Sequence, residues 1–155
     1  MRTSPSALDR LARLALWLTR PPPLLRICAG LCAAALIVGV LTLGATPLAV
    51  DAVPDGWDKV AHMSLHFVVS VCLLMALRPR GALWVILLCL LFATTDEVAQ
   101  IFEPGRTASI FDWTADVIGA SLGIACVSLG QRVSSRVEEA GNFTAEAGET
   151  VDETT

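Results

Sequence analysis

Four long apolar segments constrain the fold of this chain more than any other feature. They are residues 27–50, 60–77, 82–102 and 110–130, and short stretches with polar residues, proline or glycine separate them. Each is close to the roughly 20 residues that a helix needs to cross about 30 Å of hydrocarbon. Hydrophobic residues make up 54% of the 155 residues and charged residues 17%, which leaves no room for a separate soluble domain. The sequence therefore predicts an all-α, polytopic membrane protein with four transmembrane helices.

Basic residues near the ends of these segments predict the orientation of the helices. Lys and Arg in short loops resist translocation, so they mark the cytoplasmic side of the membrane. Nine of the 11 basic residues precede the first segment, separate the second from the third, or follow the fourth: Arg2, Arg10, Arg13, Arg20, Arg26, Arg78, Arg80, Arg132 and Arg136. The other two loops carry only Lys59 and Arg106. Both termini are therefore expected to be cytoplasmic.

The regions that flank the four segments differ from each other in charge. Residues 1–26 are basic, and Ser6 followed by Asp9 is typical of the capped start of a short amphipathic helix. Such a helix would lie on the anionic cytoplasmic leaflet. At the other end, the last 18 residues contain six acidic residues and no basic ones. We expect 27–130 to form the membrane domain and 131–155 to form an acidic, disordered cytoplasmic tail.

Ionisable residues gather where the second apolar segment begins. Asp58 and Lys59 open this segment, and His62 and His66 follow at helical spacing. Lys59, His62 and His66 share one helical face, and His66 lies roughly 10–12 Å below the start of the helix. Because ionisable groups inside hydrocarbon cost several kcal/mol unless they are paired or hydrated, these residues are candidates for a functional site.

The end of the third segment carries a second polar group. Glu97 and Gln100 are three residues apart and therefore share a helical face. The next residues, Glu103-Pro104-Gly105-Arg106, match a type II turn with proline at its second and glycine at its third position. Such a turn directs Arg106 back towards the helices.

The fourth segment begins with a polar pattern and continues with small residues. Ser109 is a predicted helix cap, with Asp112 three residues later and Asp116 one turn deeper. Gly119 and Gly123 then form a stripe that allows another helix to approach closely. The antiparallel topology brings the start of the second helix, the end of the third and the start of the fourth to one membrane face. We expect His66, Glu97 and Asp116 to lie there at similar depths.

The order and spacing of these residues resemble the pattern of the VanZ-like family. The resemblance covers 58–123 and rests on Asp58, Lys59, His62, Glu97, Gln100, Pro104, Gly105, Arg106, Ser109, Asp112, Gly119 and Gly123. It implies a multi-pass protein of the bacterial cytoplasmic (inner) membrane and cell envelope. The family is named for a member associated with teicoplanin resistance, so a link to glycopeptide resistance or to envelope homeostasis is also implied. Asp116 stands where the family pattern usually has Asn, and His66 where an aromatic residue is common.

Three hypotheses account for the polar residues. In the first, a site open to the outer leaflet binds an anionic membrane lipid or a lipid-linked cell-wall precursor, with Lys59, Arg106 and protonated His62 holding phosphate. Its expected ligand-binding residues are Asp58, Lys59, His62, Glu97, Gln100, Arg106, Ser109, Asp112 and Asp116. In the second, the chain is a membrane-embedded enzyme or a proton- or ion-coupled transporter, with His62 or Glu97 as proton carrier. In the third, salt bridges such as Glu97 with Arg106 fix helix packing and bind no ligand.

The sequence indicates no cofactor and no nucleic-acid partner. No metal is expected, but the alternative is a divalent cation held by His62, His66, Glu97 and Asp116. The two histidines are four residues apart, as in zinc sites, but Met63 replaces the glutamate of the zinc-protease pattern. The basic residues follow membrane topology and the net charge is −4, which argues against nucleic-acid binding. No pattern predicts an oligomeric state.

Overall fold

The computed structural model describes residues 21–44, 46, 53–54, 56–77, 81–102 and 106–152. Beyond Arg136, only the side chain of Glu139 is described. The predicted amphipathic segment before residue 21 and the predicted turn at 103–105 therefore lie outside the described residues.

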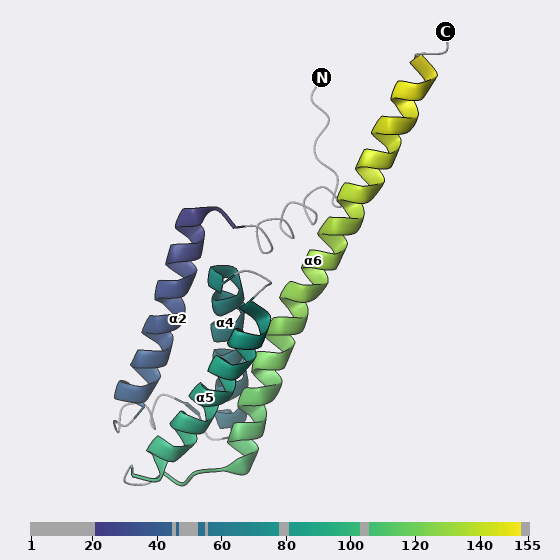
Figure 1. Ribbon diagram of the computed structural model, residues 1–155. Coiled ribbons are helices and arrows are strands. Elements are labelled where there is room, and N and C mark those ends of the chain that lie inside the picture. Colours follow the sequence, from purple (N-terminus) through teal and green to yellow (C-terminus); the bar gives the residue numbers. More distant parts are fainter. Residues whose placement is uncertain are drawn as a thin grey trace.

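The described chain is all helical and contains no strand. It forms α2 (Pro23–Leu43), α4 (Asp58–Leu77), α5 (Ala82–Gln100) and α6 (Ile110–Asp152), as Figure 1 shows. Four helical stretches are long and apolar enough to cross a membrane: α2, α4, α5 and the first 27 residues of α6, which end at Arg136. The prediction of four transmembrane helices is confirmed.

The first helix begins and ends earlier than the predicted segment, 27–50. Pro23 occupies its first turn, where a proline is tolerated because the missing N–H has no partner within the helix. The helix ends at Leu43, and the N–H of Gly44 still donates to the carbonyl of Val40, at 2.8 Å. The apolar composition continues beyond this point, but Pro47 cannot extend a helix.

The last helix is longer than the predicted segment, 110–130. Its backbone stays helical to Asp152 and extends beyond the bundle, as Figure 1 shows. The sequence predicted disorder over 131–155, and the structure differs from that prediction up to residue 152. The acidic composition opposes a packed core, but this stretch contains no proline and is rich in alanine and glutamate, which favour helix.

The closest helix packing joins α4 to α6. A Cβ at Gly119 would overlap the backbone carbonyl of Met63, and a Cβ at Gly123 would overlap the hydroxyl of Ser70. The predicted small-residue stripe therefore lies in the α4–α6 interface. An apolar core lies farther along these helices, away from the start of α6, and consists of the buried residues Leu74, Val85, Cys89, Ala120 and Val127.

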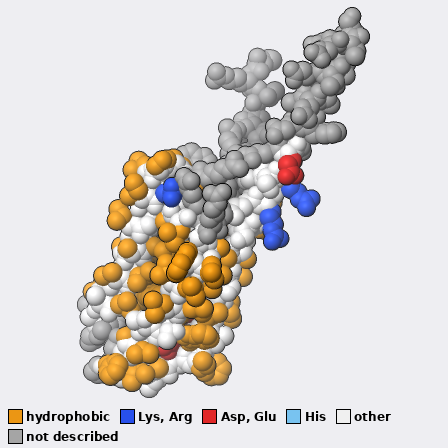
Figure 2. Space-filling view, in the orientation of Figure 1, with side chains coloured by type: hydrophobic (Ala, Val, Ile, Leu, Met, Phe, Trp, Pro, Cys, Tyr) orange, Lys and Arg blue, Asp and Glu red, His pale blue; other side chains and the backbone are white. Residues whose placement is uncertain are grey.

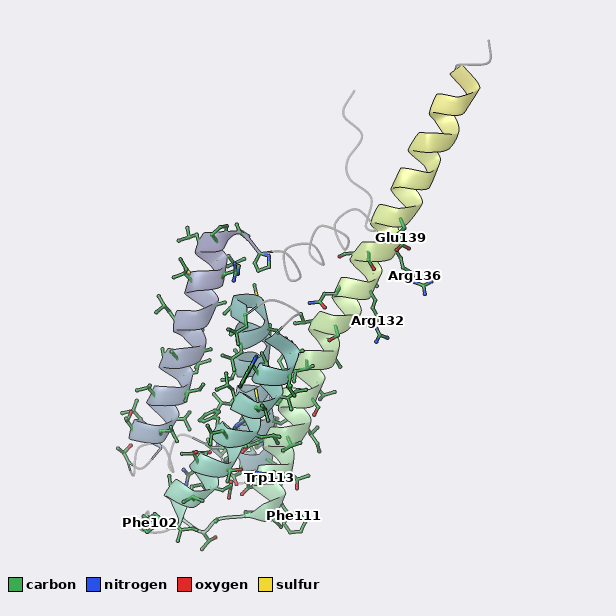
Figure 3. The ribbon with its side chains drawn as sticks, in the orientation of Figure 1. Phe102, Phe111, Trp113, Arg132, Arg136 and Glu139 are labelled. Atoms are coloured by element: carbon green, nitrogen blue, oxygen red, sulfur yellow. The ribbon has the colours of Figure 1, made fainter. Side chains whose placement is uncertain are left out.

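The two ends of the bundle differ in charge. Hydrophobic side chains cover the face shown in Figure 2, and the visible Lys and Arg side chains lie towards the end from which α6 extends. Figure 3 labels Arg132 and Arg136 there, with Phe102, Phe111 and Trp113 at the opposite end. Arg26, in the first turn of α2, donates from Nε and Nη2 to the carbonyl of Ala76 near the end of α4, at 3.2 and 2.9 Å. A cytoplasmic location of both termini stays a prediction.

Candidate functional site

The end of the bundle formed by the start of α4, the end of α5 and the start of α6 holds most of the buried polar side chains. We call this region the polar end. Its buried members come from three helices: His62, His66, Asp96, Glu97, Gln100, Asp112 and Asp116. Chain reversal between successive helices brings these residues together although up to 54 positions separate them. The sequence predicted this convergence.

Two histidines of α4 share one carboxylate of α6. The Nδ1 of His62 lies 3.0 Å and the Nδ1 of His66 2.8 Å from Oδ1 of Asp116. Because an ionised carboxylate only accepts hydrogen bonds, both Nδ1 atoms carry the proton. His66 Nδ1 also lies 3.2 Å from the carbonyl oxygen of His62, and its ring stacks on Phe92 with centroids 4.7 Å apart. His66 and Asp116 are completely buried, so this contact fixes α4 against α6.

Asp96 joins the same group from α5. Its Oδ2 lies 3.8 Å from Nδ1 of His62 and 3.4 Å from Nε2 of Gln100, which donates to it. Sequence reasoning placed Gln100 in the site through its spacing from Glu97 and did not include Asp96. The spacing of four residues between Asp96 and Gln100 could have indicated that Asp96 belongs to the site. Residues four apart share a helix face, just as residues three apart do.

Glu97 forms its hydrogen bond with the backbone just ahead of α6, and not with a basic side chain. Its Oε2 accepts a hydrogen bond from the backbone N–H of Ser109 at 2.6 Å. Ser109 is at the predicted cap position, because its carbonyl accepts from the N–H of Trp113 at 3.0 Å. A carboxylate from α5 thus satisfies a donor just ahead of the positive end of α6. The indole N–H of Trp113 adds a second α5–α6 contact, donating to Thr94 Oγ1 at 3.3 Å.

The two basic residues of the polar end lie nearer the outside of the bundle. Lys59 Nζ is 3.1 Å from Oδ1 of Asp112, and the lysine side chain is 59% exposed. Arg106 donates from Nη1 to the carbonyl of Gly44, at 3.2 Å, and so contacts the end of α2. Asp58 is half-exposed and lies 3.8 Å from Nε2 of His62. The predicted site residues therefore share one end of the bundle, but Arg106 reaches it from the side of α2.

Asp116 lies close to both of the residues that were predicted to share its depth, His66 and Glu97. Asp116 contacts His66 directly, whereas Glu97 belongs with His62, Asp96 and Asp116. These four residues each offer a ligand atom, and the four atoms lie within 4.8 Å of one another. His66, which the sequence hypothesis included as a metal ligand, is one helical turn deeper than His62.

A model of the VanZ/LLP1 family matches residues 31–131, about two thirds of the chain and nearly all of the four-helix bundle. The chain belongs to the VanZ/LLP1 family. The matched region of this VanZ/LLP1 protein contains every residue of the polar end and extends beyond 58–123, on which the resemblance rested. Searches of curated proteins and of solved structures found no match.

Family membership and the four apolar helices together make this a VanZ-like, multi-pass membrane protein. In this VanZ/LLP1 chain the polar end and two grooves are the features that a ligand could use. One groove, between α2 and α5, has a volume of about 310 Å³, and the other, between the end of α5 and the start of α6, about 400 Å³. Both volumes are in the range of small-molecule sites, which run from about 300 to 1,000 Å³.

Proposed function

We propose that this protein binds an anionic membrane lipid or a lipid-linked cell-envelope precursor, with a hydrocarbon chain between α2 and α5 and the phosphate at the polar end. The observation that carries the proposal is the groove between α2 and α5. It is lined almost entirely by apolar side chains, and it lies on the side of the bundle where Arg106 contacts the end of α2. An apolar groove with a basic group beyond one end suits an amphipathic anion.

The length of the groove fits one leaflet. Its wall on α2 runs from Gly30 to Leu41 at helical spacing, which corresponds to roughly 16 Å along the helix. Half of the roughly 30 Å hydrocarbon thickness is about the same depth. Leu88, Leu91 and Thr95 of α5 form the facing wall. A chain of a lipid in the leaflet at the polar end could therefore lie along α2 without leaving the membrane.

The headgroup chemistry is supported by the two basic residues of the polar end. The Arg106 guanidinium presents N–H donors in a planar fork that matches phosphate geometry. Its bond to the Gly44 carbonyl places it at the end of α2, next to the groove that Leu41 and Thr95 line. Lys59 is mostly exposed and is oriented by Asp112. If both termini are cytoplasmic, as predicted, this headgroup position lies in the outer leaflet.

The alternative that the polar residues serve packing alone explains part of the structure. It accounts for the Asp116 contacts and for the bond from Ser109 to Glu97. It gives no reason for a groove that separates α2 from α5 over about the depth of one leaflet. Packing alone would be served better by side chains that filled this space, because lipid-facing helices associate through close contact.

Native mass spectrometry of the detergent-purified protein tests the proposal. We expect the wild type to retain a phosphorylated lipid, and Arg106→Gln and Ala34→Trp to retain at least tenfold less. Ala34 lines the groove, so a tryptophan there fills it. Ala35→Trp is the matched control, because Ala35 is the next residue, is also exposed, and does not line the groove.

Folding is checked in each variant by circular dichroism and by elution volume. Equal retention of lipid by all four proteins would contradict the proposal. Loss of lipid in Ala35→Trp as well would show that bulk on α2, and not occupation of the groove, causes the effect.

A further inference from the structure

Four buried side chains from three helices converge at the centre of the polar end. They are His62 from α4, Asp96 and Glu97 from α5, and Asp116 from α6, and their exposed fractions are 8%, 5%, 7% and 0%. One nitrogen or oxygen ligand atom of each lies within 4.8 Å of those of the other three. Three carboxyl groups and one imidazole are thus gathered in a space of the size of a single coordination shell.

Each of the three carboxyl groups is held by a neighbour through one of its oxygens. Ser109 N–H binds Oε2 of Glu97, Gln100 binds Oδ2 of Asp96, and His66 binds Oδ1 of Asp116. Neighbours of this kind orient the ligands of protein metal sites. The described residues provide no hydrogen-bond partner for the second oxygen of Glu97, Oε1, or of Asp116, Oδ2, although both atoms are buried. Buried polar oxygens without partners are costly, so these two atoms are available to bind a cation.

The distances suit a small cation. Bonds of about 2.0–2.2 Å from a tetrahedral metal place its ligand atoms roughly 3.3 Å from one another. His62 Nδ1 lies 3.0 Å from Oδ1 of Asp116 and 3.8 Å from Oδ2 of Asp96, on either side of that value. Small side-chain rotations would therefore bring these groups onto one ion. Without an ion, Nδ1 of His62 donates a proton to Asp116. A bound ion would replace that proton, which would move to Nε2 of His62 or be released.

Charge favours a divalent ion over a proton alone. Three carboxylates in a low-dielectric interior repel one another. The ammonium of Lys59 is mostly exposed and paired with Asp112, and the single charge of Arg106, which acts on Asp96, offsets only part of this repulsion. A divalent cation would neutralise most of the cluster's charge. One imidazole with three carboxylates is a donor set for first-row transition metals such as Zn²⁺ or Mn²⁺, since imidazole favours them over Ca²⁺ and Mg²⁺.

We propose that His62, Asp96, Glu97 and Asp116 bind one divalent transition-metal ion. Gln100, Ser109 and His66 orient the three carboxylates, and the groove between α5 and α6, which Glu97 and Ser109 line, gives the ion a route to the site. This differs from the metal set that the sequence suggested, because Asp96 replaces His66. The inference goes beyond lipid binding and does not depend on it.

A second group of possible metal ligands also contains His62, and the experiment must distinguish it from the proposed site. Asp58, His62 and Asp112 also lie close enough to one another to hold an ion. This group is less buried, and Lys59 already occupies Oδ1 of Asp112. Variants of Asp96 and Asp112 therefore separate the two sites, because each residue belongs to only one of them.

The test is metal binding by the full-length protein, purified in detergent without a polyhistidine tag and stripped with a chelator. Zn²⁺ is added, and bound metal is counted by elemental mass spectrometry after removal of free ion. We expect one Zn²⁺ per wild-type chain, and affinity at least about 100-fold weaker in Asp96→Asn and Glu97→Gln. Asp112→Asn and Asp58→Asn, the matched controls, should bind as the wild type does.

Two further measurements make the result independent of folding and of lipid. Co²⁺ in place of Zn²⁺ should give a visible absorption spectrum of nitrogen and oxygen ligation that changes in His62→Gln. His66→Phe, which removes only a supporting contact, should weaken binding by about 10- to 100-fold without abolishing it.

The proposal is overturned if the folded wild type binds no Zn²⁺ or Co²⁺ at micromolar concentration, or if Asp112→Asn loses metal while Asp96→Asn retains it. Asp96→Asn should still retain lipid, which separates failure of this site from failure of the lipid site.

Discussion

The interface between α4 and α6 and the interface between α2 and α5 differ in how closely the two helices pack. In the first, Gly119 and Gly123 allow the two backbones to touch, and the contact of Asp116 with two histidines joins the helices at the polar end. In the second, an apolar groove separates the helices over much of their length. Helices in lipid associate through close contact and polar bonds, since lipid tails are as apolar as their side chains.

The comparison indicates which part of the bundle is rigid and which part can admit a ligand. Much of the polar cluster belongs to α4 and α6, the pair with the closest packing. α2 packs beside α4, and one arginine contact is found near each of its ends: Arg26 with Ala76, and Arg106 with Gly44. Between these contacts it faces α5 across the groove. This arrangement places a fixed polar site beside an open apolar groove, as the proposed binding of a lipid requires.

The largest effect is expected from filling the closest contact. Gly119→Val places a side chain against the backbone carbonyl of Met63, which cannot move without displacing α4. We expect the free energy of unfolding to fall by about 3 kcal/mol, the upper end of the usual range for overpacking. Unfolding by SDS in mixed micelles measures it. Gly39→Val is the matched control, because a Cβ at Gly39 meets nothing within 4 Å, and a similar loss there would contradict the comparison.

A smaller but still large effect is expected from removing the shared carboxylate. Asp116→Ala leaves two imidazole N–H groups without their buried acceptor. The expected loss of unfolding free energy is about 2–3 kcal/mol, measured in the same micelles. Asp58→Ala serves as control, and because Asp58 is half-exposed its loss should be below about 1 kcal/mol. Equal losses for the two would mean that the buried contact contributes no more than a surface pair.

The smallest effect is expected where α2 is attached to α4. Arg26→Gln removes the paired hydrogen bonds to Ala76, and we expect a loss of about 1 kcal/mol. Hydrogen exchange should become faster in α2 and stay unchanged in α6 as far as Arg136. Arg132→Gln, on the exposed surface of α6, is the control and should change neither. Faster exchange throughout the bundle would show that α2 is as firmly integrated as α6.

Much of the site could be predicted because membrane helices alternate in direction. Once 60–77, 82–102 and 110–130 are recognised as spans, His62, Glu97 and Asp116 must lie at the same end of the bundle. Spacing could not show which side chains meet, because that depends on helix rotation. Asp96 was therefore missed as a partner of His62. One of the three hypotheses paired Glu97 with Arg106, whereas the carboxylate of Glu97 accepts a hydrogen bond from the backbone of Ser109.

The sequence by itself determined the number of spans, the VanZ-like family, the end of the bundle that is polar, and the stripe of glycines that allows close packing. These follow from hydrophobic length and from local spacing, which are properties of single segments. The tertiary structure alone decided that two histidines share Asp116, that Arg106 contacts the end of α2, and that a groove remains between α2 and α5. These depend on how helices rotate and tilt against one another, and that is set by side-chain packing across the whole bundle.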